Sequence, residues 1–321
     1  MRRTVKIWLI TAASLVLIGC MILGGVMTML EWDFAKLSTN KYETNNYEIN
    51  ENYTDISIIT KTADVVFMPS ETSSSYVECY EQKNVKHSVT VKGDTLVIEV
   101  VDSRKWYEHI GINFYTAKIT IYIPQGEYGA LLMKSSTGDI EIPKDFKFKN
   151  IDIEESTGNV TSFASALETV KIKTSTGAIR VEGMSAGMLD LSVSTGNVTV
   201  SDVTCDEDVK IGVSTGKTYL TDIVCQSVLS SGNTGDIILK NVVSAKKFSI
   251  KRSTGDIKLE GSDAAEIFVE TDTGDVKGSL LSDKVFITKT DTGSINVPSS
   301  VAGGKCEIIT DTGDIKIEIQ N

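Results

Sequence analysis

The chain has 321 residues, of which 41% are hydrophobic and 7% aromatic, with a formal net charge of −11. This acidic balance argues against nucleic-acid binding, which needs a basic footprint. It also disfavours broad electrostatic docking on anionic lipid.

The N-terminus has the pattern of a membrane segment. Residues 7–30 (IWLITAASLVLIGCMILGGVMTML) carry no charge and are long enough to cross a bilayer as a helix. Basic side chains precede this segment within residues 1–6, so the positive-inside rule predicts a cytoplasmic tail there and an extracellular body. The sequence therefore predicts a single-pass protein of the cell membrane, in which the polar residues 31–45 form a stalk.

A cleaved signal is the alternative to this anchor. Leu17-Ile18-Gly19-Cys20 resembles a lipobox, which would make Cys20 a lipidated N-terminus. Residues 21–30 stay apolar, however, and an uncleaved span explains this better than a lipoprotein spacer does. We therefore favour the span.

Residues 46–133 are expected to form an irregular β cap and the first coils of the fold that follows. YVECY, VTV, LVIEVV and KITIYIP alternate like strands between residues 76 and 124. Lys92-Gly93-Asp94 is typical of a hairpin turn between two of them.

One segment of the cap, residues 102–117 (DSRKWYEHIGINFYTA), breaks the strand pattern. It gathers Trp106, Tyr107, Phe114 and Tyr115 in a chain with few aromatic residues. The simplest interpretation is a loop folded back over the core of the cap. The alternative is a contact patch for a partner or a glycan, because clustered aromatic side chains on an exposed loop favour recognition.

A repeat governs the rest of the chain. The dipeptide Thr-Gly occurs ten times between residues 137 and 313, always 19 or 20 residues apart. Apolar residues alternate before each copy, as in Ile151 and Ile153, and after it, as in Val198 and Val200. Each interval is too short for a domain, so each must be one supersecondary unit that packs on its neighbours.

Two short strands per unit, joined by Thr-Gly turns, predict an all-β fold. Stacked in register, coils of 19–20 residues over 134–321 give a parallel β-solenoid. Residues 56–69 (ISIITKTADVVFMP) resemble a degenerate copy of the unit, with Ala63 in the place of the glycine. The last strand, within residues 315–321, is expected at the open far end, where end-to-end association could occur.

The repeats resemble a known family. KSSTGDI at 134–140, KRSTGDI at 251–257 and TDTGDI at 310–315 follow one apolar N-terminal segment, as in the bacterial LiaG-like "putative adhesin" family, a domain of unknown function. The resemblance covers about residues 46–321. It implies a single-stranded, right-handed β-solenoid attached to a bacterial envelope, and it supplies no catalytic residues.

Composition also limits the chemistry of the repeats. The two histidines, His87 and His109, lie outside the Thr-Gly units, which excludes Ser/His/Asp catalysis and histidine-based metal sites there. Acidic pairs such as Asp272 with Asp275 recur because the turn recurs, which argues against one unique catalytic pair. We therefore expect no enzyme and no cofactor.

Two smaller features allow alternatives. Asp236, Asp256 and Asp275 would stack on successive coils, where calcium could relieve their repulsion; the simpler interpretation is turn aspartates that accept backbone N–H bonds. Cys205 and Cys225 occupy equivalent sites on adjacent coils, where buried small hydrophobic residues are favoured over a disulfide.

The expected function is a non-enzymatic binding, adhesion or scaffold surface in a bacterial cell envelope. Its partner would be an envelope component or a membrane protein, and not nucleic acid. One alternative is a regulatory partner of an envelope-stress signalling system. Another is a carbohydrate-active β-helix enzyme.

Overall fold

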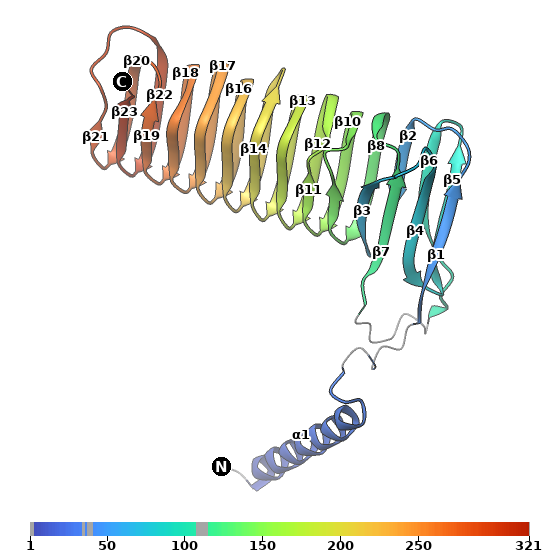
Figure 1. Ribbon diagram of the computed structural model, residues 1–321. Helices are drawn as coiled ribbons and strands as arrows, with labels where there is room; N and C mark the ends of the chain where they lie inside the picture. Colours follow the sequence, from blue (N-terminus) through green and yellow to red (C-terminus); the bar gives the residue numbers. More distant parts are fainter. Residues whose placement is uncertain (1–2, 34–35, 37–40, 107–114, 321) are drawn as a thin grey trace.

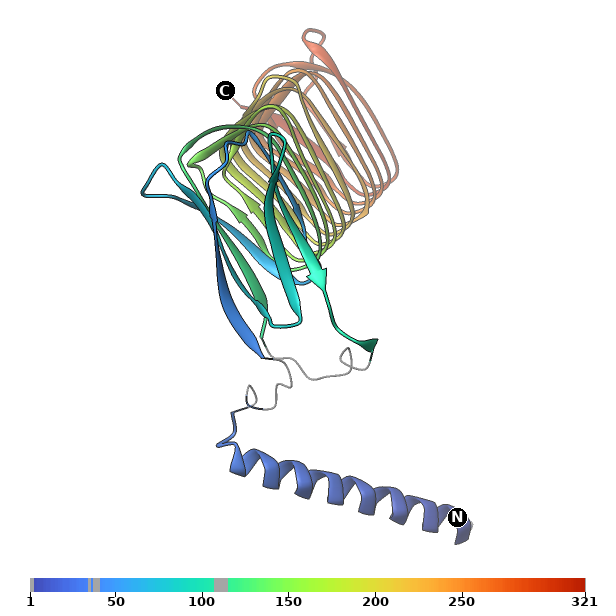
Figure 2. The same cartoon turned by 90° about the vertical axis from the view of Figure 1, so that its right-hand side faces the viewer.

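The computed structural model describes residues 3–33, 36, 41–106 and 115–320. This part of the chain contains one helix and 23 strands, and the strands belong to a single hydrogen-bonded sheet. The sheet winds into a flattened rod (Figure 1). Viewed along the rod, successive coils superimpose as nested loops with two long sides (Figure 2). The expected all-β solenoid is confirmed.

The helix, α1 (Arg3–Met29), begins inside the segment that the sequence assigned to the tail. Within the described residues it is the one helix long and apolar enough to cross a membrane, over Thr4–Met29. It contains no proline and no acidic residue, so nothing in its sequence interrupts the helix.

Seven strands form the cap. They are β1 (Tyr42–Ile49), β2 (Asp55–Ile59), β3 (Ala63–Pro69), β4 (Ser75–Gln82), β5 (Val85–Lys92), β6 (Thr95–Asp102) and β7 (Ala117–Ile123). The predicted hairpin joins β5 to β6, and Gly93 takes the left-handed conformation at its tip with φ of 61°.

The boundary of the predicted stalk was wrong. Residues 42–45, which the sequence assigned to the stalk, already belong to β1 and pair with β4. This strand is polar on most of its length because it lies at an edge of the sheet, so it lacks the apolar alternation that marks a strand in sequence.

The degenerate repeat at residues 56–69 is confirmed as a coil. β2 runs parallel to β8 (Gly126–Thr137), with Ile56 opposite Leu131, and β3 runs parallel to β9 (Ile140–Ile142). A Cβ atom added to Gly138 would lie 2.1 Å from the carbonyl oxygen of Ala63, so Ala63 does stand at the head of the glycine column.

The shaft carries the regular coils on two sides, which we call wall A and wall B. Wall A contains the segment before each Thr-Gly, and wall B contains the segment after it. Besides β8 and β9, the strands are β10 (Phe146–Thr157), β11 (Val160–Ser162), β12 (Ser165–Thr176), β13 (Ile179–Thr195), β14 (Val198–Cys205), β15 (Asp208–Thr215), β16 (Thr218–Thr234), β17 (Ile237–Thr254), β18 (Ile257–Thr273) and β19 (Val276–Leu280).

Glycine is required at the first corner of each coil of the shaft. Gly196, for example, has φ of 147°, and a Cβ atom there would lie 1.8 Å from the carbonyl oxygen of Gly177 on the previous coil. The backbones therefore approach too closely at this corner for any side chain. This close approach explains why the sequence repeats Thr-Gly so strictly.

The second corner differs from the expectation of two separate short strands per coil. β13, β16, β17 and β18 run through this corner as single elements of 17 or 18 residues. One residue in the left-handed conformation makes the turn within each element, and glycine, asparagine and aspartate tolerate that conformation best. The column consists of Gly183, Asp222, Asn241 and Gly261 in these four elements and of Asp202 in the shorter strand β14.

The core is a thin layer between the two walls. Its columns hold one aliphatic or aromatic side chain per coil, as in the wall A column of Ile151, Val170, Leu189 and Val209, all buried. Burial of each such side chain contributes roughly 1.5–3 kcal/mol. Cys79, Cys205, Cys225 and Cys306 are buried as free thiols, which agrees with the preferred interpretation of Cys205 and Cys225.

The far end of the rod does not follow chain order. It contains β20 (Lys284–Thr292), β21 (Ile295–Asn296), β22 (Gly304–Thr312) and β23 (Ile315–Ile319). β22 pairs with β18 on one side and β20 on the other, and β23 lies between β19 and β21. The coil of β22 and β23 is thus inserted before the terminal coil, which consists of β20 and β21 (Figure 1).

This order corrects the expectation that the last strand of the chain is the open end. Two glycines let the inserted coil fit: a Cβ atom on Gly303 would lie 1.8 Å from the carbonyl oxygen of Asp283, and one on Gly304 would lie 1.8 Å from that of Ala265. Lys284 fastens the terminal coil, since its Nζ lies 2.7 Å from Oδ1 of Asp263 on β18 and both side chains are largely buried.

Candidate binding surfaces on the cap and the shaft

The aromatic loop of the cap is only partly described. Trp106 is 79% exposed and Tyr115 is 42% exposed, whereas Tyr107 and Phe114 lie outside the described residues. The carbonyl of Tyr115 accepts a hydrogen bond from the hydroxyl of Tyr42 at 3.0 Å. The ring of Tyr42 also stacks on Tyr80, with centroids 5.1 Å apart. Sequence reasoning missed Tyr42 and Tyr80 because they are distant in the chain; the role of this patch stays a prediction.

The turn aspartates have a structural role. The Oδ1 atom of Asp236 accepts the backbone N–H of Asp256 at 3.2 Å, and that of Asp256 accepts the N–H of Asp275 at 2.9 Å. Asn159 and Asn197 make the same bond to the next coil. Where the turn carries Asp or Asn, its side-chain oxygen thus accepts a backbone N–H of the next turn, as the simpler interpretation held. Calcium at this ladder stays a prediction.

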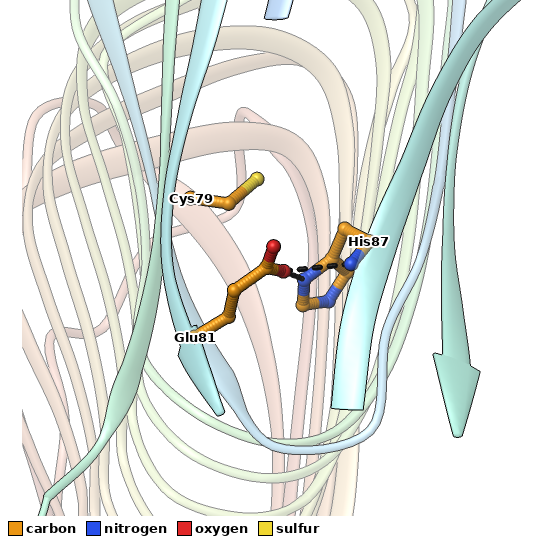
Figure 3. A group of neighbouring side chains, drawn as sticks. All are labelled: Cys79, Glu81 and His87. Carbon is orange, nitrogen blue, oxygen red and sulfur yellow. Dashed lines mark hydrogen bonds and ion pairs between the residues drawn. The ribbon is translucent and has the colours of Figure 1, made fainter. Parts of the chain in front are cut away.

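A polar cluster lies between the walls of the cap. β4 and β5 are joined by a tight hairpin but share one register pair, Gln82 with Val85, because β4 continues along wall B and β5 along wall A. Glu81 lies where they separate. Its Oε2 accepts the backbone N–H of His87 at 2.6 Å and lies 2.7 Å from Nδ1 of the same residue (Figure 3).

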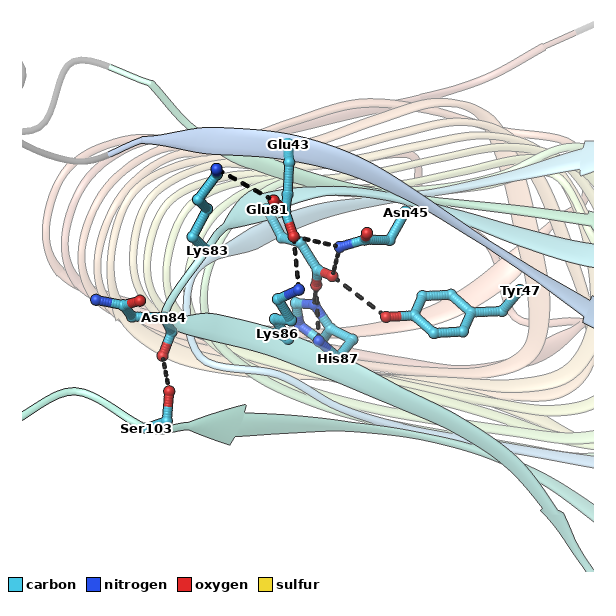
Figure 4. Close-up of polar contacts among 9 residues, drawn as sticks. All are labelled: Glu43, Asn45, Tyr47, Glu81, Lys83, Asn84, Lys86, His87 and Ser103. Atoms are coloured by element: carbon cyan, nitrogen blue, oxygen red, sulfur yellow. Dashed lines mark hydrogen bonds and ion pairs between the residues drawn. The ribbon is translucent and has the colours of Figure 1, made fainter.

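The other atoms of this cluster also have partners. Oε1 of Glu81 accepts hydrogen bonds from Asn45 at 2.7 Å and from the hydroxyl of Tyr47 at 3.4 Å (Figure 4). The Thr60 hydroxyl lies 2.9 Å from Nε2 of His87. The carboxylate thus accepts the backbone N–H of His87 at a point where β4 and β5 no longer pair.

Cys79, Glu81 and His87 are, in the described part of the chain, the one group of three potential metal ligands whose atoms all lie within 4.8 Å of one another. Burial raises the pKa of the Cys79 thiol to about 12, and the charge of Glu81 adds to this effect. A metal needs the thiolate and would displace hydrogen bonds that already satisfy Glu81 and His87. These donors therefore fit a metal poorly, and we interpret the cluster as structural.

The exposed face of wall A is hollowed in the middle of the shaft. Ser192, Gly212 and Ser231 occupy one outward row on three successive coils, and the next residue of that row is Lys251. These four residues line a groove of about 480 Å³. They also line an adjoining hollow of about 370 Å³. Small side chains in this row create the groove. Their equivalent positions in three successive repeats are visible in the sequence, but sequence reasoning missed them.

One end of the groove is charged. Nζ of Lys251 lies 2.7 Å from Oε2 of Glu270 and 5.0 Å from the centre of the Phe268 ring. Beneath it, Arg252 is buried, because Gly232 on the previous coil leaves room for its guanidinium. That group donates to the carbonyl of Val213 at 2.7 Å. The Arg252 side chain therefore occupies the space that Gly232 leaves in the wall under the groove.

Comparison with known proteins agrees with this architecture. A structure from Parabacteroides distasonis ATCC 8503, titled "Putative lipid binding protein", matches with a TM-score of 0.52 and 18% identity over 75% of this chain and 98% of its own. A "putative adhesin" from Parabacteroides merdae ATCC 43184 matches with a TM-score of 0.51 and 12% identity over 75% and 97%. At these identities the likeness concerns the fold alone.

None of the curated proteins compared with this chain matches it. The Toastrack DUF4097 family profile matches residues 53–214 and, in a second overlapping match, residues 206–321. Together these matches cover the cap from the first coil onward and the whole shaft. The chain therefore belongs to the Toastrack DUF4097 family.

Proposed function

We propose that this chain is a non-enzymatic binding module anchored in a bacterial cell membrane, with its solenoid outside the cell. The groove on wall A is the observation that carries this proposal. It supplies a long, shallow, polar surface on a rigid support, which suits an extended hydroxyl-rich ligand such as an envelope glycan. Two structural neighbours carry the titles "Putative lipid binding protein" and "putative adhesin", and both titles name binding rather than catalysis.

The groove offers little support for catalysis. Glu270 is paired with Lys251, and the groove lining contains no histidine and no cysteine. Asp272 is the other acidic residue in the groove lining, and no further unpaired carboxylate lines this groove to act with it as an acid and base pair. A surface that binds without chemistry is therefore the function that we favour over a carbohydrate-active enzyme.

A sedimentation assay tests the binding proposal. The purified full chain in detergent is mixed with insoluble cell-wall glycan, and the bound fraction is measured. Gly212→Gln fills the groove at a position where an added Cβ atom would lie 3.8 Å from Oγ of Ser192, an ordinary contact. We expect this variant to bind about tenfold more weakly. Thr199→Gln, on the outer face of wall B, is the matched control and should bind like the unchanged chain.

The other outcomes of this assay discriminate between the alternatives. Full binding by Gly212→Gln with loss in Trp106→Ala would place the contact on the aromatic loop. Release of soluble sugar fragments would support an enzyme. Absence of glycan binding, with capture of a membrane signalling protein instead, would favour a regulatory role.

The anchor is tested separately. We propose that α1 is retained as a single membrane span, and that its basic N-terminus lies in the cytoplasm as the positive-inside rule predicts. The mass of the chain isolated from membranes should then include residues 1–30. A chain that begins at a lipidated Cys20 would support the lipobox instead. Added protease should digest the solenoid in intact cells, and protection there would contradict the proposed topology.

A further inference from the structure

The terminal coil leaves one strand edge open. β20 has nine residues, Lys284–Thr292, and among the described residues β22 is its strand neighbour on one side while none pairs with the other side. An unpaired edge offers backbone N–H and C=O groups to another strand. Soluble proteins usually blunt such an edge with charges, proline or a bulge.

The first half of the open β20 edge carries apolar side chains, and its exposed charges, Lys289 and Asp291, lie in the second half. Val285 is 38% exposed and Ile287 is 50% exposed on its outer face. On the inner face Phe286 is only partly buried, because no further coil covers it. By contrast, β1 at the cap edge carries Glu43 and Glu48. A partner strand would therefore bury more apolar surface at the terminal coil than at the cap edge.

Wall B of the terminal coil is closed to such pairing. β21 has two residues, and the chain then leaves the strand through Pro298, which has no N–H to donate. A partner strand therefore fits on wall A and not on wall B. This restricts the geometry of any association to β20.

We propose that β20 pairs antiparallel with β20 of a second copy of the chain, about a two-fold axis through Thr288. This register gives all nine residues a partner, and it keeps outer side chains on the outer face. It sets Ile287 opposite Lys289 of the second copy and Val285 opposite Asp291. On the inner face, Phe286 lies opposite Thr290 of the second copy, which extends the core across the junction.

The charges of β20 favour its own copy as the partner. Lys289 and Asp291 form an ion pair within the strand at 3.0 Å, and both side chains are more than half exposed. In the proposed register neither one meets a like charge directly across the junction. The aliphatic stem of Lys289 covers Ile287 of the second copy, as long basic side chains commonly do. The same patch thus serves on both sides, as an isologous interface requires.

The test measures self-association of the full chain in detergent by analytical ultracentrifugation over a range of protein concentrations. The unchanged chain should form dimers. Ile287→Lys places a lysine opposite Lys289 of the second copy, twice per dimer, and should raise the dimer dissociation constant on the order of 100-fold. Ile287→Glu places a carboxylate opposite the same lysine and should keep the dissociation constant within about tenfold of the unchanged value.

Val224→Lys is the matched control, since Val224 is 55% exposed on β16, which β17, β18 and β22 separate from β20. It should dimerise like the unchanged chain, and thermal unfolding should show that all three variants fold. A monomeric unchanged chain would overturn the proposal. So would dimers unaffected by Ile287→Lys, which would point to association through α1, or equal weakening by both Ile287 variants, which would exclude this pairing.

Discussion

The two ends of the solenoid are closed in different ways. At the cap, the parallel ladder continues through β2 and β3 to β6 and β7, and then β4, β5 and β1 turn antiparallel and end in a polar edge. At the far end, one inserted coil and one terminal coil end in the unpaired edge of β20, which is apolar in its first half. A stacked repeat is stabilised only by its neighbours. The difference therefore indicates that the cap closes one end of the stack with additional strands, whereas the other end leaves one side of its last coil without a neighbour.

The largest expected effect is at the cap. Glu81→Ala would leave His87, Asn45 and Tyr47 without their shared acceptor inside the protein. Each buried donor that loses its acceptor costs about 1–3 kcal/mol, so the free energy of unfolding of the cap should fall by about 3–5 kcal/mol in total. Hydrogen exchange of β4 and β5 in the full chain, followed over a range of urea concentrations, measures this loss. Glu78→Ala, on the outer face of the same strand, should cost less than about 1 kcal/mol; equal losses would contradict the special role of Glu81.

The glycine column that joins the two ends gives the next largest effect. Gly196→Ala forces a side chain into a left-handed corner against a neighbouring carbonyl, and should lower the free energy of unfolding by about 2–4 kcal/mol. Gly93→Ala also has positive φ, but an added Cβ atom there meets nothing within 4 Å. It should cost only about 1 kcal/mol. Differential scanning calorimetry of both variants would show whether the close approach of neighbouring backbones, rather than positive φ alone, makes glycine necessary at the first corner.

The fold of the shaft could be predicted from the sequence because every coil repeats the same sequence features. Thr-Gly marks the first corner, alternation marks both walls, and Ala63 could be recognised as a variant of the same position. The second corner was missed because Gly183, Asp202 and Asn241 are different residues that share only a left-handed conformation.

The order of the coils was not readable from the repeat spacing. A coil inserted before the terminal one has the same length as any other, so the Thr-Gly interval does not change. Gly303-Gly304 was the available signal, because the chain passes between two coils there. The Glu81 cluster was missed for another reason: its members come from three strands and the Thr60 corner, and no spacing in the sequence brings them together.

At the far end a smaller and more local effect is expected. Lys284→Met removes the cation that fastens the terminal coil, and leaves Asp263 with a bond from the hydroxyl of Ser282. The terminal coil should lose about 2–3 kcal/mol of protection against opening. Hydrogen exchange should become faster over residues 284–296 and remain unchanged in the cap. Faster exchange throughout the shaft would show that the far end, too, supports the whole fold.

Acid should weaken the cap before the terminal coil. Burial raises the pKa of the Glu81 carboxyl, but hydrogen bonds from His87 and Asn45 outweigh burial and leave this pKa below its ordinary value. A lowered pKa in the folded state stabilises the cap at pH values above the ordinary carboxyl pKa, and this contribution is lost as pH falls through the folded value. At the far end, hydrogen bonds from Ser294 also lower the pKa of Asp314, but its carboxyl is exposed, so screening by water keeps the effect small.

Hydrogen exchange below pH 4.5 should therefore increase more in β4 and β5 than in β20. In Glu81→Gln, which cannot titrate at this position, cap exchange should depend less on pH, and an unchanged pH dependence would assign the acid sensitivity to another group.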